Sequence, residues 1–71
     1  MSIFYIKHAL ERMRERRISR KEVEECILRL SGVSTESEKV RRFRKSFRRA
    51  TIEVIAGLRG NHFIVITIYP L

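Results

Sequence analysis

A single glutamate inside a strongly basic region is the residue best placed to do chemistry. Glu53 is the only acidic residue after Glu38, and it lies in a β-forming segment, TIEVIAG. Seven of the eleven residues from Lys39 to Arg49 are Lys or Arg. A carboxylate among such charges could act as a general base, with a pKa lowered by its neighbours. It could also form a cross-strand ion pair that stabilises a basic sheet, and this structural role is the more common one.

His8 is the second candidate for proton transfer, because histidine exchanges a proton near neutral pH. The alternative is a partly exposed side chain in the first turn of a helix. Two histidines, one cysteine and scattered glutamates do not have the spacing of metal ligands, so we expect no metal and no other cofactor. Cys26 fits the apolar side of a helix and is expected to be a small core residue.

The basic segment itself has apolar residues between its charges. If Phe43 points inward, alternation along a strand places Arg42 and Arg44 on the opposite, open face. Clustered like charges destabilise a fold unless something offsets them, which favours an anionic partner. Phe47 and Tyr69 could stack on unpaired bases, or they could pack within the domain.

Length and charge narrow the class of protein. We expect 71 residues to form one domain, 1–71, whose small core leaves thin stability that a homodimer or a covering partner would improve. A net charge of +8 attracts polyanions, with nucleic acid as the first expectation and an acidic protein as the second. Arginine outnumbers lysine twelve to four, which suits phosphate recognition.

Segments for export or membrane insertion are not evident in the sequence, so a cytoplasmic location is expected. The acidic residues are all glutamate, without aspartate or glutamine, and this bias away from labile amides hints at a thermophilic source.

Two helices and three strands are predicted, with Ile3 to Ile6 as either a further short strand or an apolar plug. The first helix spans Lys7 to Arg17, with His8, Arg12 and Arg16 in a row placed to reach the sheet. The second runs from about Arg20 to Leu30, and Ser19 and Glu22 form a capping box at its start. Gly32 to Ser37 is expected to be a loop. The strands cover Lys39 to Arg44, Ala50 to Gly57 and His62 to Tyr69.

This order of elements predicts an α+β fold, in which an N-terminal helical hairpin packs on a three- to four-stranded antiparallel sheet. Period-two alternation assigns the residues to the two faces of the sheet. The expected inward residues are Ile52, Val54, Ala56, Ile64, Ile66 and Ile68. The expected open-face residues are Thr51, Glu53, Ile55, Val65, Thr67 and Tyr69.

The segment KHALERMRERRIS, a capped helix, a basic strand and a closing VITIYP together resemble a family of small bacterial and archaeal domains. Those domains begin with a His-Ala-x-x-Arg-Met-x-x-Arg helix and end in a Thr-x-Tyr-Pro strand. The resemblance covers nearly the whole chain. It implies a RelE/BrnT-like or barnase-like fold, a group that includes toxins of toxin–antitoxin pairs that cut RNA without metal.

Carried over by position, the resemblance matches His8, Arg12, Arg17, a basic residue at Arg42 or Arg44, and Thr67 and Tyr69. It implies that a ribose 2′-hydroxyl attacks the adjacent phosphate while cations stabilise the developing charge. The expected catalytic residues are His8, Glu53 and Arg42. The expected RNA-binding residues are Arg12, Arg16, Lys39, Arg41, Arg44, Lys45, Arg48, Arg49, Thr67 and Tyr69.

The leading hypothesis is therefore an RNA-directed toxin, a metal-independent endoribonuclease neutralised by an acidic antitoxin. Two alternatives stay open: a non-catalytic RNA-binding module, and an adaptor that docks an acidic protein. Loss of cleavage with retained binding on neutralising His8 or Glu53 would identify a nuclease. A binding module would respond only to arginine changes, and an adaptor would have little affinity for RNA at physiological salt.

Overall fold

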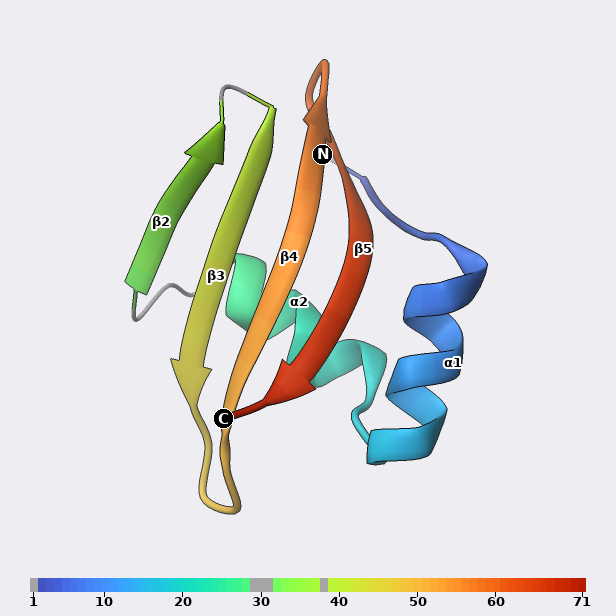
Figure 1. The fold of residues 1–71 in the computed structure, drawn as a ribbon, viewed down its shortest axis with the longest axis vertical. Coiled ribbons are helices and arrows are strands. Elements are labelled where there is room, and N and C mark those ends of the chain that lie inside the picture. Colours follow the sequence, from blue (N-terminus) through green and yellow to red (C-terminus); the bar gives the residue numbers. More distant parts are fainter. Residues whose placement is uncertain (1, 29–31, 38) are drawn as a thin grey trace.

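Two helices pack on one side of a five-stranded sheet, which confirms the α+β class (Figure 1). The computed structural model describes residues 2–28, 32–37 and 39–71. The elements are β1 (Ile3–Tyr5), α1 (Lys7–Arg16), α2 (Arg20–Leu28), β2 (Gly32–Ser37), β3 (Val40–Ser46), β4 (Thr51–Arg59) and β5 (His62–Pro70). Their order across the sheet is β1-β5-β4-β3-β2. Neither described helix is long and apolar enough to cross a membrane.

The sheet is mixed, so the prediction of a purely antiparallel sheet is wrong. β2, β3, β4 and β5 pair antiparallel, whereas β1 lies parallel to β5 with Phe4 opposite Ile64. Of the two interpretations of Ile3 to Ile6, the strand is correct for Ile3–Tyr5. The backbone contact continues beyond the strand, where the Ile6 amide donates to the Val65 carbonyl at 3.2 Å. A short β-branched and aromatic segment has thus occupied the edge that β5 would otherwise expose.

Gly32–Ser37 forms the edge strand β2, and the loop prediction for this segment is wrong. Its backbone pairs with β3 from Gly32 opposite Arg44 to Ser37 opposite Val40, with an irregularity between Thr35 and Ser37. The composition GVSTES is typical of a loop, but the outer edge of β3 supplies backbone partners for it. Pairing with that edge outweighed weak local propensity.

The two helices form as the sequence predicts, with slightly different ends. The Ser19 hydroxyl accepts the Glu22 amide at 3.1 Å, and the Glu22 carboxylate accepts the Ser19 amide at 2.9 Å, which confirms the capping box. α2 is described to Leu28, and the predicted end at Leu30 lies outside the described residues. α1 ends one residue before the predicted Arg17, which adopts a left-handed conformation with φ 56°.

One hydrophobic core lies between the helices and the sheet. α1 contributes Ala9 and Met13, and α2 contributes Val23, Cys26 and Ile27. α1 packs on β5 and α2 packs on β3 and β4, and in Figure 1 the strands lie in front of α2. The sheet contributes Phe43, Ile52, Val54, Ala56, Val65 and Ile68.

A β-bulge in β5 changes the predicted assignment of residues to faces. Ile55 pairs with Thr67 but Ala56 pairs with Val65, so Ile66 has no separate partner on β4. The extra residue reverses the alternation, and Val65 is fully buried while Ile64 and Ile66 are only half-buried. The predictions for Val65, Ile64 and Ile66 are therefore wrong. Those for Ile52, Val54, Ala56 and Ile68 are confirmed.

We call the surface opposite the helices the open face. By register and alternation it carries Val40, Arg42 and Arg44 from β3, Glu53, Ile55 and Gly57 from β4, and Ile64, Ile66, Thr67 and Tyr69 from β5.

Candidate anion-binding site

Glu53 is the one buried charged residue among those described, with 2% of its surface exposed at the middle of the open face. The strand register places Arg44 opposite it on β3 and Tyr69 opposite it on β5. Arg44 donates to Glu53 Oε1 from Nε at 3.2 Å and from Nη2 at 2.9 Å. The Tyr69 hydroxyl donates to Oε2, and Arg42 Nε lies 3.7 Å from the same oxygen. Two arginines and a phenol thus converge on one carboxylate.

The protonation states of this cluster follow from its contacts. Burial by itself would raise the pKa of Glu53, but hydrogen bonds from Tyr69 and Arg44 and the charges of Arg42 and Arg44 outweigh it. The net result is a pKa below the ordinary value for a glutamate. The hydrogen bond to Glu53, together with burial, raises the pKa of Tyr69. At neutral pH the cluster therefore holds a carboxylate, a neutral phenol and two guanidinium ions.

The cluster carries two positive charges against one negative charge. The side chains of Arg42 and Arg44 are 37% and 55% exposed, whereas that of Glu53 is 3% exposed. Glu53 therefore holds the Arg44 guanidinium at the surface by hydrogen bonds and attracts that of Arg42 by its charge. Arg44 uses two of its five N–H groups on the carboxylate and turns others toward solvent. Two guanidinium groups beside one carboxylate, with N–H groups left over, can bind a phosphate or another anion.

Hydroxyl groups border the cluster on the same face. The Ser46 and Thr51 hydroxyls lie 3.1 Å apart, at the end of the strands beyond Arg44 and Glu53. Thr67, predicted to contact RNA, lies on the open face opposite Ile55. It is two residues before Tyr69 on the same face of β5. The structure thus brings Arg42, Arg44, Thr67 and Tyr69 together around Glu53.

The predicted site residues of α1 lie elsewhere. α1 buries Ala9 and Met13 in the core on the helix side of the sheet, so its row of polar residues is not on the face of Glu53. His8 is exposed, and its Nε2 accepts Arg12 Nε at 3.5 Å. Arg12 also pairs with Glu15 at 3.2 Å, and Arg16 is exposed in the last turn. His8 and Glu53 therefore do not form one acid–base pair.

The basic residues of 39–49 are divided among several places. Arg41 and Lys45 alternate with Arg42 and Arg44, so they point to the helix side, opposite Ala56 and Ile52. Arg48 is exposed in the turn between β3 and β4, and Lys39 is exposed at the other end of β3. Phe47 packs against the core beneath Lys45, whose Nζ lies 5.8 Å from the ring centroid. This packing makes Phe47 unsuited to base stacking.

Arg49 ties the sheet to both helices. Its Nη2 donates to the Arg17 carbonyl at 2.8 Å and to the two Glu22 oxygens at 2.8 and 3.0 Å. Burial would raise the pKa of Glu22, but the hydrogen bonds from Ser19 and Arg49 and the Arg49 charge lower it overall. The contacts of Arg49 are those of a structural ion pair, although it was predicted to bind RNA.

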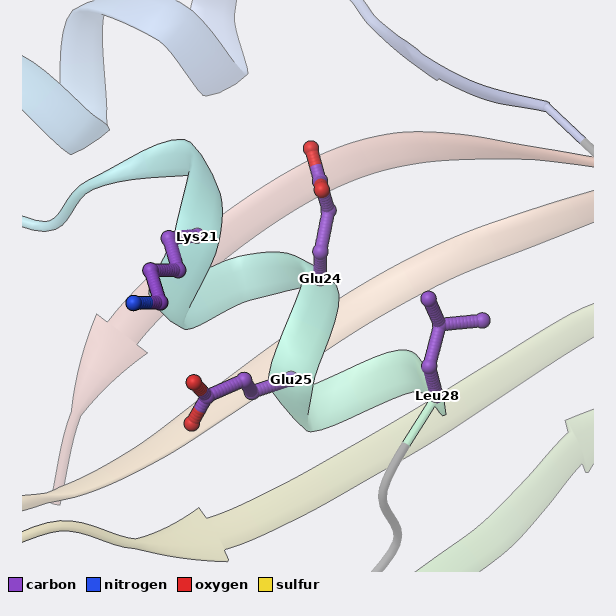
Figure 2. Close-up of a pocket in the computed structure, with 4 residues that line it drawn as sticks. All are labelled: Lys21, Glu24, Glu25 and Leu28. Atoms are coloured by element: carbon purple, nitrogen blue, oxygen red, sulfur yellow. The ribbon is translucent and has the colours of Figure 1, made fainter.

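Two surface hollows were not predicted. One lies on the outer side of α2, lined by Lys21, Glu24, Glu25 and Leu28, and Figure 2 shows it with the sheet behind the helix. Its two carboxylates, Glu24 and Glu25, make it a poor match to an anion. The other lies on the open face around Gly57. A glycine within a strand pattern, as at Gly57, is the sequence signal that could have indicated it.

Within residues 2–28, 32–37 and 39–71, no group of three or more potential ligands could hold a metal ion.

The chain belongs to the family described as Domain of unknown function (DUF4258), whose model matches residues 5–70. No match to a curated protein or to a solved structure was found. The matched residues include the whole of the cluster around Glu53.

Proposed function

We propose that this DUF4258 domain binds single-stranded RNA on the open face, with Arg42 and Arg44 holding the phosphate backbone. The observation that carries the proposal is the buried Glu53 carboxylate, which holds the partly exposed Arg44 by two hydrogen bonds and lies 3.7 Å from Arg42 Nε. A chain charge of +8 supports it, because such a field attracts polyanions from a distance. The resemblance to RelE-like and BrnT-like toxins makes RNA the favoured polyanion.

The test compares a site arginine with a matched helix arginine. Arg44→Ala and Arg14→Ala each remove one positive charge, but Arg14 is exposed on α1, away from the open face. For a labelled single-stranded oligoribonucleotide, we expect Arg44→Ala to lose about tenfold in affinity and to lower the salt slope by about one. Arg14→Ala should change both quantities little. Equal losses in the two variants would mean that the charge of the chain, not the open face, binds RNA.

RNA cleavage is the second candidate function, favoured by the contact between Tyr69 and Glu53 beside two cations. In metal-independent cleavage a base takes the proton of the 2′-hydroxyl, which attacks the phosphorus. The 5′-oxygen then leaves with a proton from an acid. Arg42 and Arg44 would stabilise the charge on the phosphorane. The lowered pKa of Glu53 makes it a weak base, so binding is better supported than catalysis by the domain alone.

Cleavage can be measured in EDTA on the samples used for binding. If the domain is a nuclease, Tyr69→Phe and Glu53→Gln should lose cleavage while they retain RNA affinity. Cleavage by His8→Ala would then be unimpaired, because α1, which carries His8, packs on the helix side of the sheet. Loss of cleavage in His8→Ala alone would instead assign the proton transfer to α1. Binding without cleavage by the unmodified protein would support the RNA-binding module.

A toxin role requires a partner that masks the open face. An acidic antitoxin would compete with RNA for Arg42 and Arg44, and it could also supply the stability that a small core lacks. A homodimer through the same surface would have a similar effect. An acidic protein that competes with RNA at equimolar concentration, and loses affinity for Arg44→Ala, would support the toxin role.

A further inference from the structure

The open face carries a second feature beyond the cluster around Glu53. A hollow of about 380 Å³ lies where β4 and β5 approach their turn. Its lining residues are Lys39, Gly57, Leu58, Arg59, Gly60 and Ile64. The volume falls within the range of roughly 300 to 1,000 Å³ that small-molecule sites occupy. Gly57 and Ile64 pair across the strands, and Ile66 Cδ1 lies 3.8 Å from the position of a Gly57 Cβ, so the floor is strand backbone and aliphatic side chains.

An aromatic pair that does not itself line the hollow lies next to Ile64, which does. Phe4 on β1 is in register with Ile64, and its ring meets the His62 ring edge to face, with centroids 5.5 Å apart. Phe4 is 53% exposed. Exposed rings next to a flat floor are the arrangement on which unpaired bases stack.

The hollow lies on the same strand and the same face as the arginine cluster. Gly57 is four residues beyond Glu53 on β4, which corresponds to about 13 Å at the rise of an extended strand. Lys39 and Arg59 contribute positive charge at the rim. An extended polyanion of a few nucleotides can therefore contact both places at once.

We propose that this hollow is a nucleobase subsite of the open face. One base of a single-stranded RNA lies on the floor formed by Gly57 and Ile64, beside the Phe4 and His62 rings. The phosphates continue toward Arg42 and Arg44. The inference rests on the proposed RNA binding, and it adds that the face recognises bases as well as backbone charge.

Gly57→Val is the variant that tests the subsite. A Cβ at Gly57 would lie 3.6 Å from the Lys39 carbonyl oxygen and 3.8 Å from Ile66 Cδ1, which are ordinary contacts. Valine also favours strands, so the sheet should accommodate it while the side chain occupies the floor. The probes are an intact single-stranded oligoribonucleotide and an abasic oligonucleotide of the same length, at one salt concentration.

The unmodified protein should bind the intact oligonucleotide about tenfold more tightly than the abasic one, because stacking adds to phosphate contacts. Gly57→Val should abolish this preference and leave the abasic affinity unchanged. Phe4→Ala removes an exposed ring and should reduce the same preference. Circular dichroism of both variants should match that of the unmodified protein.

The outcomes separate the subsite from RNA binding itself. Equal affinity for the two oligonucleotides would overturn the subsite while RNA binding stands. Binding of neither would overturn both. A preference that persists in Gly57→Val and in Phe4→Ala would place base recognition elsewhere. If the unmodified protein instead shows no preference and self-associates, and Gly57→Val is monomeric, the hollow is a contact between copies and the subsite is wrong.

Discussion

Glu53 shows how a single carboxylate can organise a basic surface. Its two oxygens accept hydrogen bonds from opposite sides, Arg44 on β3 and Tyr69 on β5. Without a negative charge between them, Arg42 and Arg44 would repel each other on adjacent positions of one strand face. The carboxylate therefore stabilises the sheet and keeps the arginines in place, even if it never exchanges a proton with a substrate.

Replacing Glu53 with glutamine should destabilise the fold but keep or increase anion affinity. Loss of the buried charged acceptor should lower the unfolding free energy by about 1 to 3 kcal/mol at neutral pH. RNA affinity should hold or rise, because the gain in net positive charge outweighs the looser placement of Arg42 and Arg44 once the carboxylate is gone. Urea unfolding and RNA titration of the same samples measure both. Glu15→Gln is the control, since Glu15 is 60% exposed and its pair with Arg12 should contribute little.

The difference in unfolding free energy between the unmodified protein and Glu53→Gln should depend on pH with a defined sign. The folded pKa of Glu53 lies below its unfolded value, near 4.5, so its stabilisation is fully present above pH 4.5. It is lost as the pH falls through the folded pKa. The difference between the unmodified protein and Glu53→Gln should therefore be constant near neutrality and shrink below pH 4.5. Glu22 also has a lowered pKa, but it is common to both proteins and cancels. A difference that grows toward acid pH would contradict the assignment.

At the scale of elements, the end of α1 carries an identifiable strain. Arg17 adopts a left-handed conformation while its amide bonds to the carbonyls of Met13 and Arg14. Non-glycine residues adopt this conformation at a cost, and glycine is the residue that usually occupies it. Any residue at position 17 would keep the backbone carbonyl that accepts the hydrogen bond from Arg49.

Arg17→Gly should therefore stabilise the protein, by about 0.5 to 1 kcal/mol in urea unfolding. The neighbouring Arg16→Gly is the matched control, because it removes the same side chain from a right-handed helical position. It should destabilise the protein by about 1 kcal/mol. Destabilisation by both substitutions would mean that the Arg17 side chain, not its backbone conformation, matters at this position.

Local patterns predicted the elements whose signals are local. Ser19 and Glu22 fixed the start of α2, and alternation in β4 placed Glu53 on the face opposite Ile52 and Val54. The bulge at Ile66 was not predictable from period-two alternation, because a bulge depends on the partner strand. Gly32–Ser37 became a strand through pairing with β3, a contact of the folded chain.

The candidate site was predicted in its sheet part and not in its helix part. Alternation placed Arg44 and Tyr69 with Glu53, since all three lie on strands that pair in register. His8 was grouped with Glu53 from residue type and resemblance, which do not specify where a helix packs. The Gly57 hollow depends on a missing side chain between neighbouring strands. The glycine is visible in the sequence, but the lining of the hollow depends on how the strands pair.

At the scale of the whole molecule, the net charge of +8 is not concentrated on one face. Arg49 is committed to Glu22 and Arg17, and Arg12 to Glu15, while Arg42 and Arg44 reach the open face. Arg49 therefore holds the helices to the sheet, whereas Arg12 pairs within α1. Because a domain this small has one core, each of these contacts contributes to the same free energy of unfolding.

Cys26 provides a direct measure of that stability. It is fully buried on α2, and burial raises the pKa of its thiol to about 11, so a thiol reagent should reach it only after opening. If the domain is stable by about 3 to 5 kcal/mol, labelling at neutral pH should be slower than in urea by roughly two to four orders of magnitude. Labelling can be followed by mass spectrometry, since Cys26 is the single cysteine.

Glu53→Gln and Arg17→Gly show whether Cys26 becomes exposed by unfolding of the whole domain. Glu53→Gln should speed the labelling of Cys26, and Arg17→Gly should slow it, each by the factor that its change in unfolding free energy predicts. Glu53 lies on the opposite side of the sheet from Cys26, so an effect on labelling must pass through the cooperative core. If neither substitution changes the rate of Cys26 labelling, α2 detaches from the sheet without unfolding of the whole domain. The contact of Arg49 with Glu22 would then be too weak to hold the helix to the sheet.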